Sequence, residues 1–284
     1  EIAAWWGSSR LGCSSVRILA DGKPSLTCIY GEGARMPMIH RFSRTELLIG
    51  KAGLAALAES KVAIFGIGGV GSYAAEALAR TGIGSLTLVD HDRVDLTNLN
   101  RQIHALESTV GMYKVDVMRG RILDINPHCQ VEVSREFFQP DQEADFLNKG
   151  YDYVIDAIDS VPSKIGLVCG CLHRGIPIVS AMGAANKLDP TGFQVVDISE
   201  TYNDPLARVI RRRLRDMGIS KGLKVVFSPE LPVHRGRQGG SRTRERQPAG
   251  TVAFVPAVAG LILAGVVVRE LLEAYQTGKE SSEQ

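Results

Sequence analysis

The sequence predicts an α/β protein with a Rossmann-like mixed sheet. A parallel nucleotide-binding half would be joined by antiparallel C-terminal strands, with helices on both faces. Two observations favour this fold: short apolar strands alternate with helical segments, and a glycine-rich turn stands between the first strand and its helix. The chain has 284 residues, 44% of them hydrophobic, which suffices for a sizeable core and excludes global disorder.

The expected elements follow in a regular order. Ser43-x-x-Glu46 has the form of a capping box that opens a short helix. Strands are expected at 61–65, 86–89, 131–133, 153–158 and 176–179, with helices at 74–80, from about 112 to before 127, and up to 173. Strands at 193–198 and 224–227 then flank a helix that Asp204 and Pro205 begin, and a long apolar helix ends the fold near Tyr275.

This order predicts one large domain over residues 38–278, with a polar tail at 279–284. Residues 1–37 show no clear periodicity and are interpreted as a poorly ordered leader outside that domain. Residues 229–250 are rich in Arg, Gly, Ser and Pro and read as a mobile basic loop within it.

The apolar stretch from Val252 to Val268 is about long enough to cross a bilayer. It contains Pro256, Gly260 and Gly265 and lacks a basic flank before it. These features favour a buried core helix or a dimer-interface helix over a membrane span.

Cysteine usage limits the class of protein. The five cysteines include no CxxC pair, so neither a disulfide scaffold nor a structural zinc site is expected. The reducing cytosol, and hence a cytoplasmic location, is the natural interpretation.

Positive charge is concentrated in one block. Residues 208–246 hold twelve Lys or Arg and three Asp or Glu, a balance of +9 in a chain whose formal net charge is only +2. This balance indicates a polyanion partner, and the alternative is a solvated helix face beside a loop. The candidate nucleic-acid contacts are Arg208, Arg211, Arg212, Arg213, Arg215, Arg235 and Arg237.

A nucleotide site is indicated by the glycine turn. Gly66, Gly68 and Gly71 form G-x-G-x-x-G directly after a strand, and Asp90 ends the next strand at the spacing of a ribose-binding acid. Small residues let backbone amides approach a phosphate at a helix N-terminus. These features alone do not separate NAD from ATP.

The segment after Asp90 favours a triphosphate. It packs acids, amides and a guanidinium past the carboxyl end of a strand, where open α/β sheets bind ligands. Triphosphate chemistry needs donors for the phosphates and carboxylates for a metal. The candidate residues are Asp92, Asn98, Arg101, Gln102, Lys114 on the next helix, and Asp159 after a further strand.

These residues carry a family resemblance. Gly66-x-Gly-Gly-x-Gly71, Asn98-Leu-Asn-Arg101-Gln102 and Asp156-Ala-Ile-Asp159 resemble the E1-like adenylating superfamily, which includes ubiquitin-activating, molybdopterin-synthase and thiazole-biosynthesis activating enzymes. The longer strings at 74–84, 100–106 and 153–160 are similar to its tRNA threonylcarbamoyladenosine dehydratase branch. The resemblance covers about residues 39–272, excluding the basic loop.

The resemblance implies roles by position. Gly66, Gly68, Gly69 and Gly71 would line the phosphates, Asp90 would hold the ribose, and Asp92, Asn98, Arg101, Gln102 and Lys114 would position the nucleotide. Asp159 would bind magnesium. Arg44, in an Arg-x-x-Arg motif, would reach into a partner subunit's site, which implies a homodimer with composite active sites. The catalytic set would be Arg44, Arg101, Lys114 and Asp159.

The branch implies ATP-dependent dehydration of the threonylcarbamoyl group on modified adenosine beside the tRNA anticodon. ATP would activate the carboxylate, by adenylation or by phosphorylation, and the group would close a ring on itself without a protein nucleophile. Cys169 and Cys171 then read as packing residues, so a sulfur-relay or carrier-protein partner is not expected.

Two other readings stay open. One is an E1-like enzyme that activates the C-terminal glycine of a small carrier protein. The other, from a different class, is an NAD-dependent oxidoreductase or a nucleotide sensor.

Overall fold

The computed structural model describes residues 16–18, 24–26, 39–233 and 249–282, in two compact units, 1–41 and 42–284. In the first unit, β1 (Val16–Ile18) and β2 (Pro24–Leu26) pair antiparallel, which the sequence had not predicted. Most of the predicted leader, most of the basic loop, and Arg235 and Arg237 lie outside the described residues.

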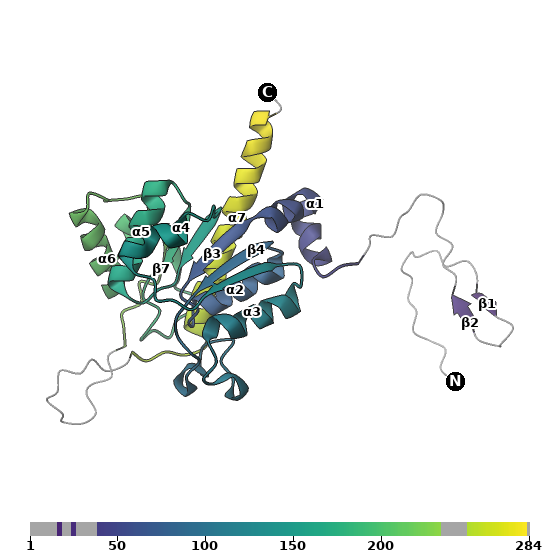
Figure 1. Ribbon diagram of the computed structural model, residues 1–284, viewed down its shortest axis with the longest axis horizontal. Coiled ribbons are helices and arrows are strands. Elements are labelled where there is room, and N and C mark those ends of the chain that lie inside the picture. The colour runs from purple at the N-terminus through teal and green to yellow at the C-terminus, as the bar shows by residue number, and fades with distance from the viewer. Residues whose placement is uncertain (1–15, 19–23, 27–38, 234–248, 283–284) are drawn as a thin grey trace. The chain divides into compact units, whose positions relative to one another are not determined.

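The second unit is built on a seven-stranded mixed sheet (Figure 1). Its order is β5-β4-β3-β6-β7-β9-β8; all neighbouring pairs are parallel except the antiparallel pair β8–β9. The predicted combination of a parallel half with antiparallel C-terminal strands is confirmed. The strands are β3 (Lys61–Phe65), β4 (Ser85–Val89), β5 (Gln130–Ser134), β6 (Tyr153–Asp156), β7 (Ile178–Ala181), β8 (Gln194–Asp197) and β9 (Lys224–Phe227).

Helices cover both faces of this sheet because strand side chains alternate between them. Val62 and Ile64 of β3 join one buried cluster, and Ala63 and Phe65 join the other. Each fully buried aliphatic or aromatic side chain contributes about 1.5–3 kcal/mol. The first cluster holds α1 (Ser43–Glu59), α2 (Gly71–Thr81), α3 (Lys114–Ile125) and α7 (Phe254–Ser282); the second holds α4 (Glu143–Leu147), α5 (Val161–Arg174) and α6 (Pro205–Asp216).

The helix ends test the predicted signals. Asp204 caps α6 by accepting a hydrogen bond from the Ala207 amide at 2.9 Å, as predicted. The capping box predicted at Ser43 is wrong: α1 begins at Ser43 itself, and Phe42 at the N-cap makes no side-chain cap bond. The last helix continues to Ser282, beyond the predicted end near Tyr275, because its polar C-terminal residues still suit a helix.

Helix α7 holds a stretch, Phe254–Gly278, long and apolar enough to cross a membrane by length and composition, with mean hydropathy 2.0. Half of its most apolar window is buried inside the protein. A Cβ at Gly260 would lie 2.2 Å from the carbonyl oxygen of Val70, so α7 approaches the start of α2 at backbone distance. This packing is that of the expected core helix.

Candidate active site

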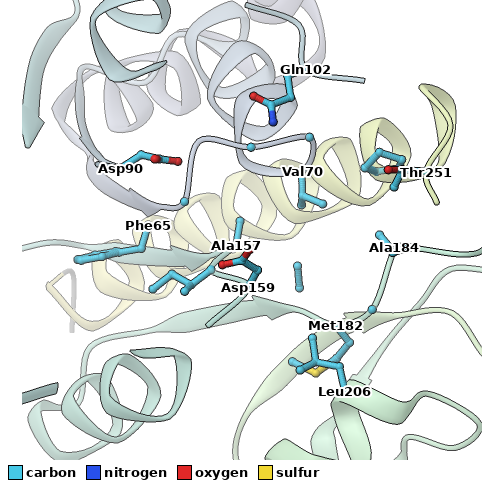
Figure 2. A pocket seen from close by; sticks show the side chains of 18 of the residues that line it. Phe65, Val70, Asp90, Gln102, Ala157, Asp159, Met182, Ala184, Leu206 and Thr251 are labelled. Carbon is cyan, nitrogen blue, oxygen red and sulfur yellow. The ribbon is translucent and has the colours of Figure 1, made fainter. Parts of the chain in front are cut away.

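A cavity of about 570 Å³ lies at the carboxyl ends of β3, β4, β6 and β7. The chain leaves β3 toward β4 on one side and returns to β6 on the other, so this edge is the switch point of the sheet. Figure 2 shows Asp90 and Gln102 on one side of the cavity, Met182 and Leu206 on the other, and Asp159 between them.

The glycine turn forms the floor of the nucleotide side. Gly66 has φ +88°, and a Cβ there would lie 2.5 Å from the carbonyl oxygen of Ala157. A Cβ at Gly71 would lie 1.8 Å from the Gly66 carbonyl oxygen, whereas one at Gly68 would meet nothing nearer than Gln102 Nε2 at 4.0 Å. The turn is therefore closely packed at Gly66 and Gly71 but open on the cavity side at Gly68. A phosphate bound at the N-terminus of α2 needs such an opening.

Asp90 ties the end of β4 to this turn. One carboxylate oxygen accepts a hydrogen bond from the Ile67 amide at 2.7 Å, and the other accepts one from the Asp92 amide at 2.8 Å. Each oxygen keeps a lone pair that a ribose hydroxyl can use. Asp90 thus shapes the turn as well as facing the cavity.

Lys114 places a cation in the cavity wall. Its Nζ lies 2.6 Å from Asp92 Oδ2, and its backbone amide donates to the Asp92 carbonyl at 3.1 Å. The Lys114 side chain is 7% exposed, while that of Asp92 is 50% exposed. A ligand phosphate would meet the Lys114 ammonium group, which Asp92 already holds in place.

The short 3₁₀ turn Leu96–Asn98 positions the next side chains. The Asp95 carboxylate accepts hydrogen bonds from the Thr97 side chain and backbone, which lower the pKa of Asp95. Arg101 donates to the Thr97 carbonyl at 2.8 Å. The buried Oε1 of Gln102 has no hydrogen-bond partner among the described residues, which suits a ligand donor.

Two acids follow β6 and differ in their environment. Asp156 is fully buried, lies 2.7 Å from Lys164 Nζ, and accepts hydrogen bonds from Ser180 Oγ and the Ile158 amide. The exposed carboxylate of Asp159 lines the cavity and makes no hydrogen bond or ion pair with the residues of the described ranges. Asp156 therefore stabilises the turn that follows β6, whereas the Asp159 carboxylate is available to a ligand.

The donor set fits a divalent cation, because carboxylate oxygens are the ligands that Mg²⁺ prefers. Asp159 offers a free carboxylate, and donor atoms of Asp90, His91 and Asp92 lie within 4.8 Å of one another. Both oxygens of Asp90 already accept backbone hydrogen bonds, and Asp92 already pairs with Lys114, so Asp159 is the least committed of these carboxylates.

Sequence reasoning missed the opposite wall of the cavity. It is formed by residues 181–187, which follow β7, and by Pro205 and Leu206 at the start of α6. The buried Nζ of Lys187 donates to the Ser228 carbonyl and lies 3.4 Å from Asp204. Its position could have been inferred from the sequence, because residues 181–187 follow a parallel strand at the edge of the sheet where ligands bind.

Most predicted nucleotide residues meet at the cavity. Its lining includes Gly66, Gly68, Gly69, Asp90, Asp92, Asn98, Arg101, Gln102, Lys114 and Asp159. Gly71 packs beneath the turn, and Arg44 is an exposed residue of α1 outside this lining. On α6, Arg208, Arg212, Arg213 and Arg215 are exposed, whereas half-buried Arg211 donates to the Thr201 carbonyl at 2.7 Å.

The described cysteines are buried thiols. Burial raises the pKa of Cys171 to about 12 and that of Cys129 to about 11, and it also raises the pKa of Cys169. Such groups carry little thiolate at neutral pH, as expected of packing residues.

Comparison with known proteins shows which family the chain belongs to. Residues 42–283 match the ThiF family. A tRNA threonylcarbamoyladenosine dehydratase of Bacillus subtilis is 52% identical over 244 residues, covering 83% of this chain and 96% of the relative. The Escherichia coli protein of that name is 48% identical over 206 residues, covering 70% and 77%. The crystal structure of E. coli tRNA N6-threonylcarbamoyladenosine dehydratase in complex with ATP matches with a TM-score of 0.77 and 42% identity, over 84% of this chain and 96% of that one. The chain belongs to the ThiF family.

Proposed function

We propose that this chain catalyses the ATP-dependent dehydration of the threonylcarbamoyl group on the modified adenosine beside the tRNA anticodon. The observation that carries the proposal is one cavity in which an open glycine turn, a held lysine and a free carboxylate meet. The similarity to dehydratases, one of them solved with ATP, supports it.

The chemistry follows from these groups. A carboxylate is a poor acylating agent because its leaving group would be oxide. Attack of a carboxylate oxygen on a phosphorus of ATP forms an acyl–phosphate bond and releases pyrophosphate (attack on the α-phosphorus) or ADP (attack on the γ-phosphorus), so that the oxygen can now leave with the phosphate group. Lys114 and Arg101 would neutralise charge that develops on the phosphates, and the glycine-turn amides would orient them. Asp159 would hold Mg²⁺, which when bound supplies further charge neutralisation.

Ring closure would complete the reaction. The carbamoyl group of the same substituent attacks the activated carbonyl, loses a proton and expels AMP or phosphate, so the net loss is one water. The enzyme then supplies orientation rather than a nucleophile. The buried, high-pKa cysteines of the described chain support this route over a thioester or persulfide route. A cytoplasmic location, where ATP and tRNA are found, belongs to the same proposal.

Helix α6 would contact the tRNA backbone. Ile210 and Leu214 are buried, while Arg208, Arg212 and Arg215 are spaced to lie along one exposed side of the helix. The helix begins at the cavity with Pro205 and Leu206, so phosphates along it would flank the entering nucleoside. Replacing the three arginines by glutamine should weaken tRNA binding and flatten its dependence on salt; unchanged binding would contradict this contact.

A homodimer would complete the site. Arg44 does not line the cavity of its own chain, and Leu47 and Leu48 beside it are 81% and 87% exposed. Exposed leucines next to a basic residue suit an interface in which Arg44 enters the partner subunit's cavity.

The test is a direct assay of the product. Purified protein, ATP, magnesium and threonylcarbamoylated tRNA are incubated, and the nucleoside mass is measured. Loss of one water is expected from the wild type and none from Asp159→Ala, whereas Asp145→Ala, an exposed acid outside the cavity lining, should be active. An unchanged nucleoside with the wild-type enzyme would overturn the proposal.

A further inference from the structure

The cavity wall opposite the nucleotide residues presents small or apolar side chains from two segments, one after β7 and one at the start of α6. These side chains belong to Met182, Ala184, Ala185, Pro205 and Leu206. Figure 2 shows Met182 and Leu206 across the cavity from Asp90 and Gln102. Apolar groups bind a ligand by shape and close contact, so what this wall binds depends on where its two segments are held.

A buried ion pair joins these two segments. Lys187 lies in the segment after β7, and Asp204 is the N-cap of α6; the distance from Lys187 Nζ to Asp204 Oδ2 is 3.4 Å. The two side chains are 1% and 0% exposed. Lys187 Nζ also donates a hydrogen bond at 2.5 Å to the carbonyl of Ser228, which directly follows β9. One ammonium group therefore connects the segment after β7 to α6 and to the end of β9.

The Asp204 carboxylate uses both of its oxygens within this wall. Oδ2 accepts a hydrogen bond from the Gly183 amide at 3.0 Å, and Oδ1 accepts one from the Ala207 amide at 2.9 Å. A Cβ at Gly183 would lie 3.1 and 3.2 Å from the two carboxylate oxygens, so glycine leaves room for the carboxylate to reach the backbone. Asp204 is thus attached to both ends of the segment from Gly183 to Lys187.

A buried ion pair is a costly way to hold two segments together. The loss of hydration offsets much of the attraction between the charges, and apolar side chains of similar volume often stabilise a fold as well or better. The pair does impose a defined geometry, because hydrogen bonds accept only a narrow range of distances and angles. Such a constraint suits a wall that must stay in one position to fit a ligand.

We propose that Lys187 and Asp204 are positioning residues that hold this wall and thereby set the affinity for the threonylcarbamoyl group of the tRNA substrate. The inference rests on the proposed function, because it takes that group as the ligand of the wall. Lys187 and Asp204 act through Gly183 and the start of α6 rather than by touching the reacting atoms.

The test uses Lys187→Met and the double variant Lys187→Met/Asp204→Asn. Lys187→Met leaves the buried Asp204 charge unpaired and should also lower Tm. The double variant removes both charges and should recover most of that Tm. It does not restore the bonds to Ser228 and Gly183, because an asparagine side chain has one acceptor oxygen, which the Ala207 amide uses.

Ile83→Ala is the control for lost stability. Ile83 is fully buried just before the amino end of β4, whereas the cavity lies at the carboxyl ends of the strands. The substitution should lower Tm by creating a void in the core. The affinities for ATP and tRNA should stay at their wild-type values.

The Kd is measured for threonylcarbamoylated tRNA, for the same tRNA without the substituent, and for ATP. Phosphate contacts are common to both tRNAs, so the ratio of their Kd values reports binding of the threonylcarbamoyl group. Wild-type protein should bind the modified tRNA more tightly. In both Lys187 variants the Kd for modified tRNA should rise at least about fivefold, as expected for lost hydrogen bonds in the wall, with the other two Kd values within about twofold of wild type.

Steady-state kinetics separate positioning from a loss of folded protein. The KM for modified tRNA should rise with its Kd while kcat stays within about twofold of wild type, because contacts made equally in the ground state and the transition state affect KM. A lower fraction of folded enzyme would instead reduce the apparent kcat and leave KM unchanged.

An unchanged Kd ratio in Lys187→Met, or a fall in kcat at constant KM, would overturn the inference. It would also be overturned if the double variant recovered wild-type affinity together with Tm, because the pair would then act through stability alone. Wild-type protein that binds both tRNAs equally would contradict the inference, whether or not it removes water. Failure of the proposed function gives a different result, namely wild-type protein that prefers the modified tRNA but removes no water from it.

Discussion

Individual residues around the cavity are held in place by side-chain partners from other elements. Lys114 is paired with Asp92, and Lys164 with Asp156, at 2.6 and 2.7 Å. Spacing after a strand predicted Asp92 and Lys114, because local order places them at the sheet edge. Spacing could not predict Lys187, because its partners Asp204 and Ser228 lie in segments that meet it only in the folded chain.

Lys114 offers the sharpest residue test of phosphate neutralisation. Lys114→Met should lower kcat/KM by about 100-fold, since one preorganised charged donor contributes about 3 kcal/mol to such a transition state. The measurement is AMP or phosphate release during tRNA dehydration. Lys114→Arg, which keeps the charge, should retain more activity than Lys114→Met; equal losses would indicate a structural rather than an electrostatic role.

His104 makes stability depend on pH. It is buried, neither ring nitrogen has a hydrogen-bond partner within the described chain, and burial lowers its pKa from 6.5 to about 4. Between pH 6.5 and pH 4, His104 is protonated in the unfolded state but stays neutral in the folded state. The free energy of unfolding therefore falls as the pH drops from 6.5 toward 4. Through His104 alone, the free energy of unfolding should be about 2 kcal/mol lower at pH 5 than at pH 7.

The check is urea unfolding at pH 5 and pH 7 for the wild type and His104→Gln. The variant should lose part of the difference between the two pH values, even where its stability at pH 7 is lower. An identical difference in both proteins would mean that His104 titrates normally in the fold.

At the scale of elements, the sequence predicted those strands and helix ends that depend on interactions between neighbouring residues. The seven strands of the large sheet and the Asp204 cap of α6 were all predicted. The start of α1 was not, because Ser43 lies within the helix and Phe42 precedes it. A capping box needs its serine outside the helix, and the residues that pack on α1 decide where that boundary falls.

The turn between β3 and α2 separates a folding role from a binding role. Gly71→Ala should lower Tm by roughly 5–10 °C, because its methyl would overlap the Gly66 carbonyl oxygen. Gly68→Ala should keep a near-normal Tm but weaken ATP binding by at least about tenfold, because its methyl projects into open space at the phosphate site. Thermal melts and ATP titrations measure both, and a reversed pattern would refute this assignment.

At the scale of the whole molecule, the sequence predicted one wall of the cavity and missed the other. The glycine turn and the acids after β4 form a compact motif with known spacing, so they could be read directly. The wall after β7 has no comparable motif, and it meets α6 only because β9 and β8 extend the sheet beyond β7. Long-range topology of this kind is not visible in local patterns.

The proposed composite site predicts complementation between two inactive variants. Arg44→Ala lacks the residue offered to the partner, and Asp159→Ala lacks the metal-binding acid of its own cavity. A mixed dimer would contain one intact site, built from Arg44 of one protomer and Asp159 of the other. Equal mixing gives half mixed dimers, so about one quarter of wild-type activity should return after the subunits exchange. Dehydration activity of the mixture measures this, with each variant alone as its control. A mixture no more active than its components, despite proven subunit exchange, would show that each chain builds its site alone.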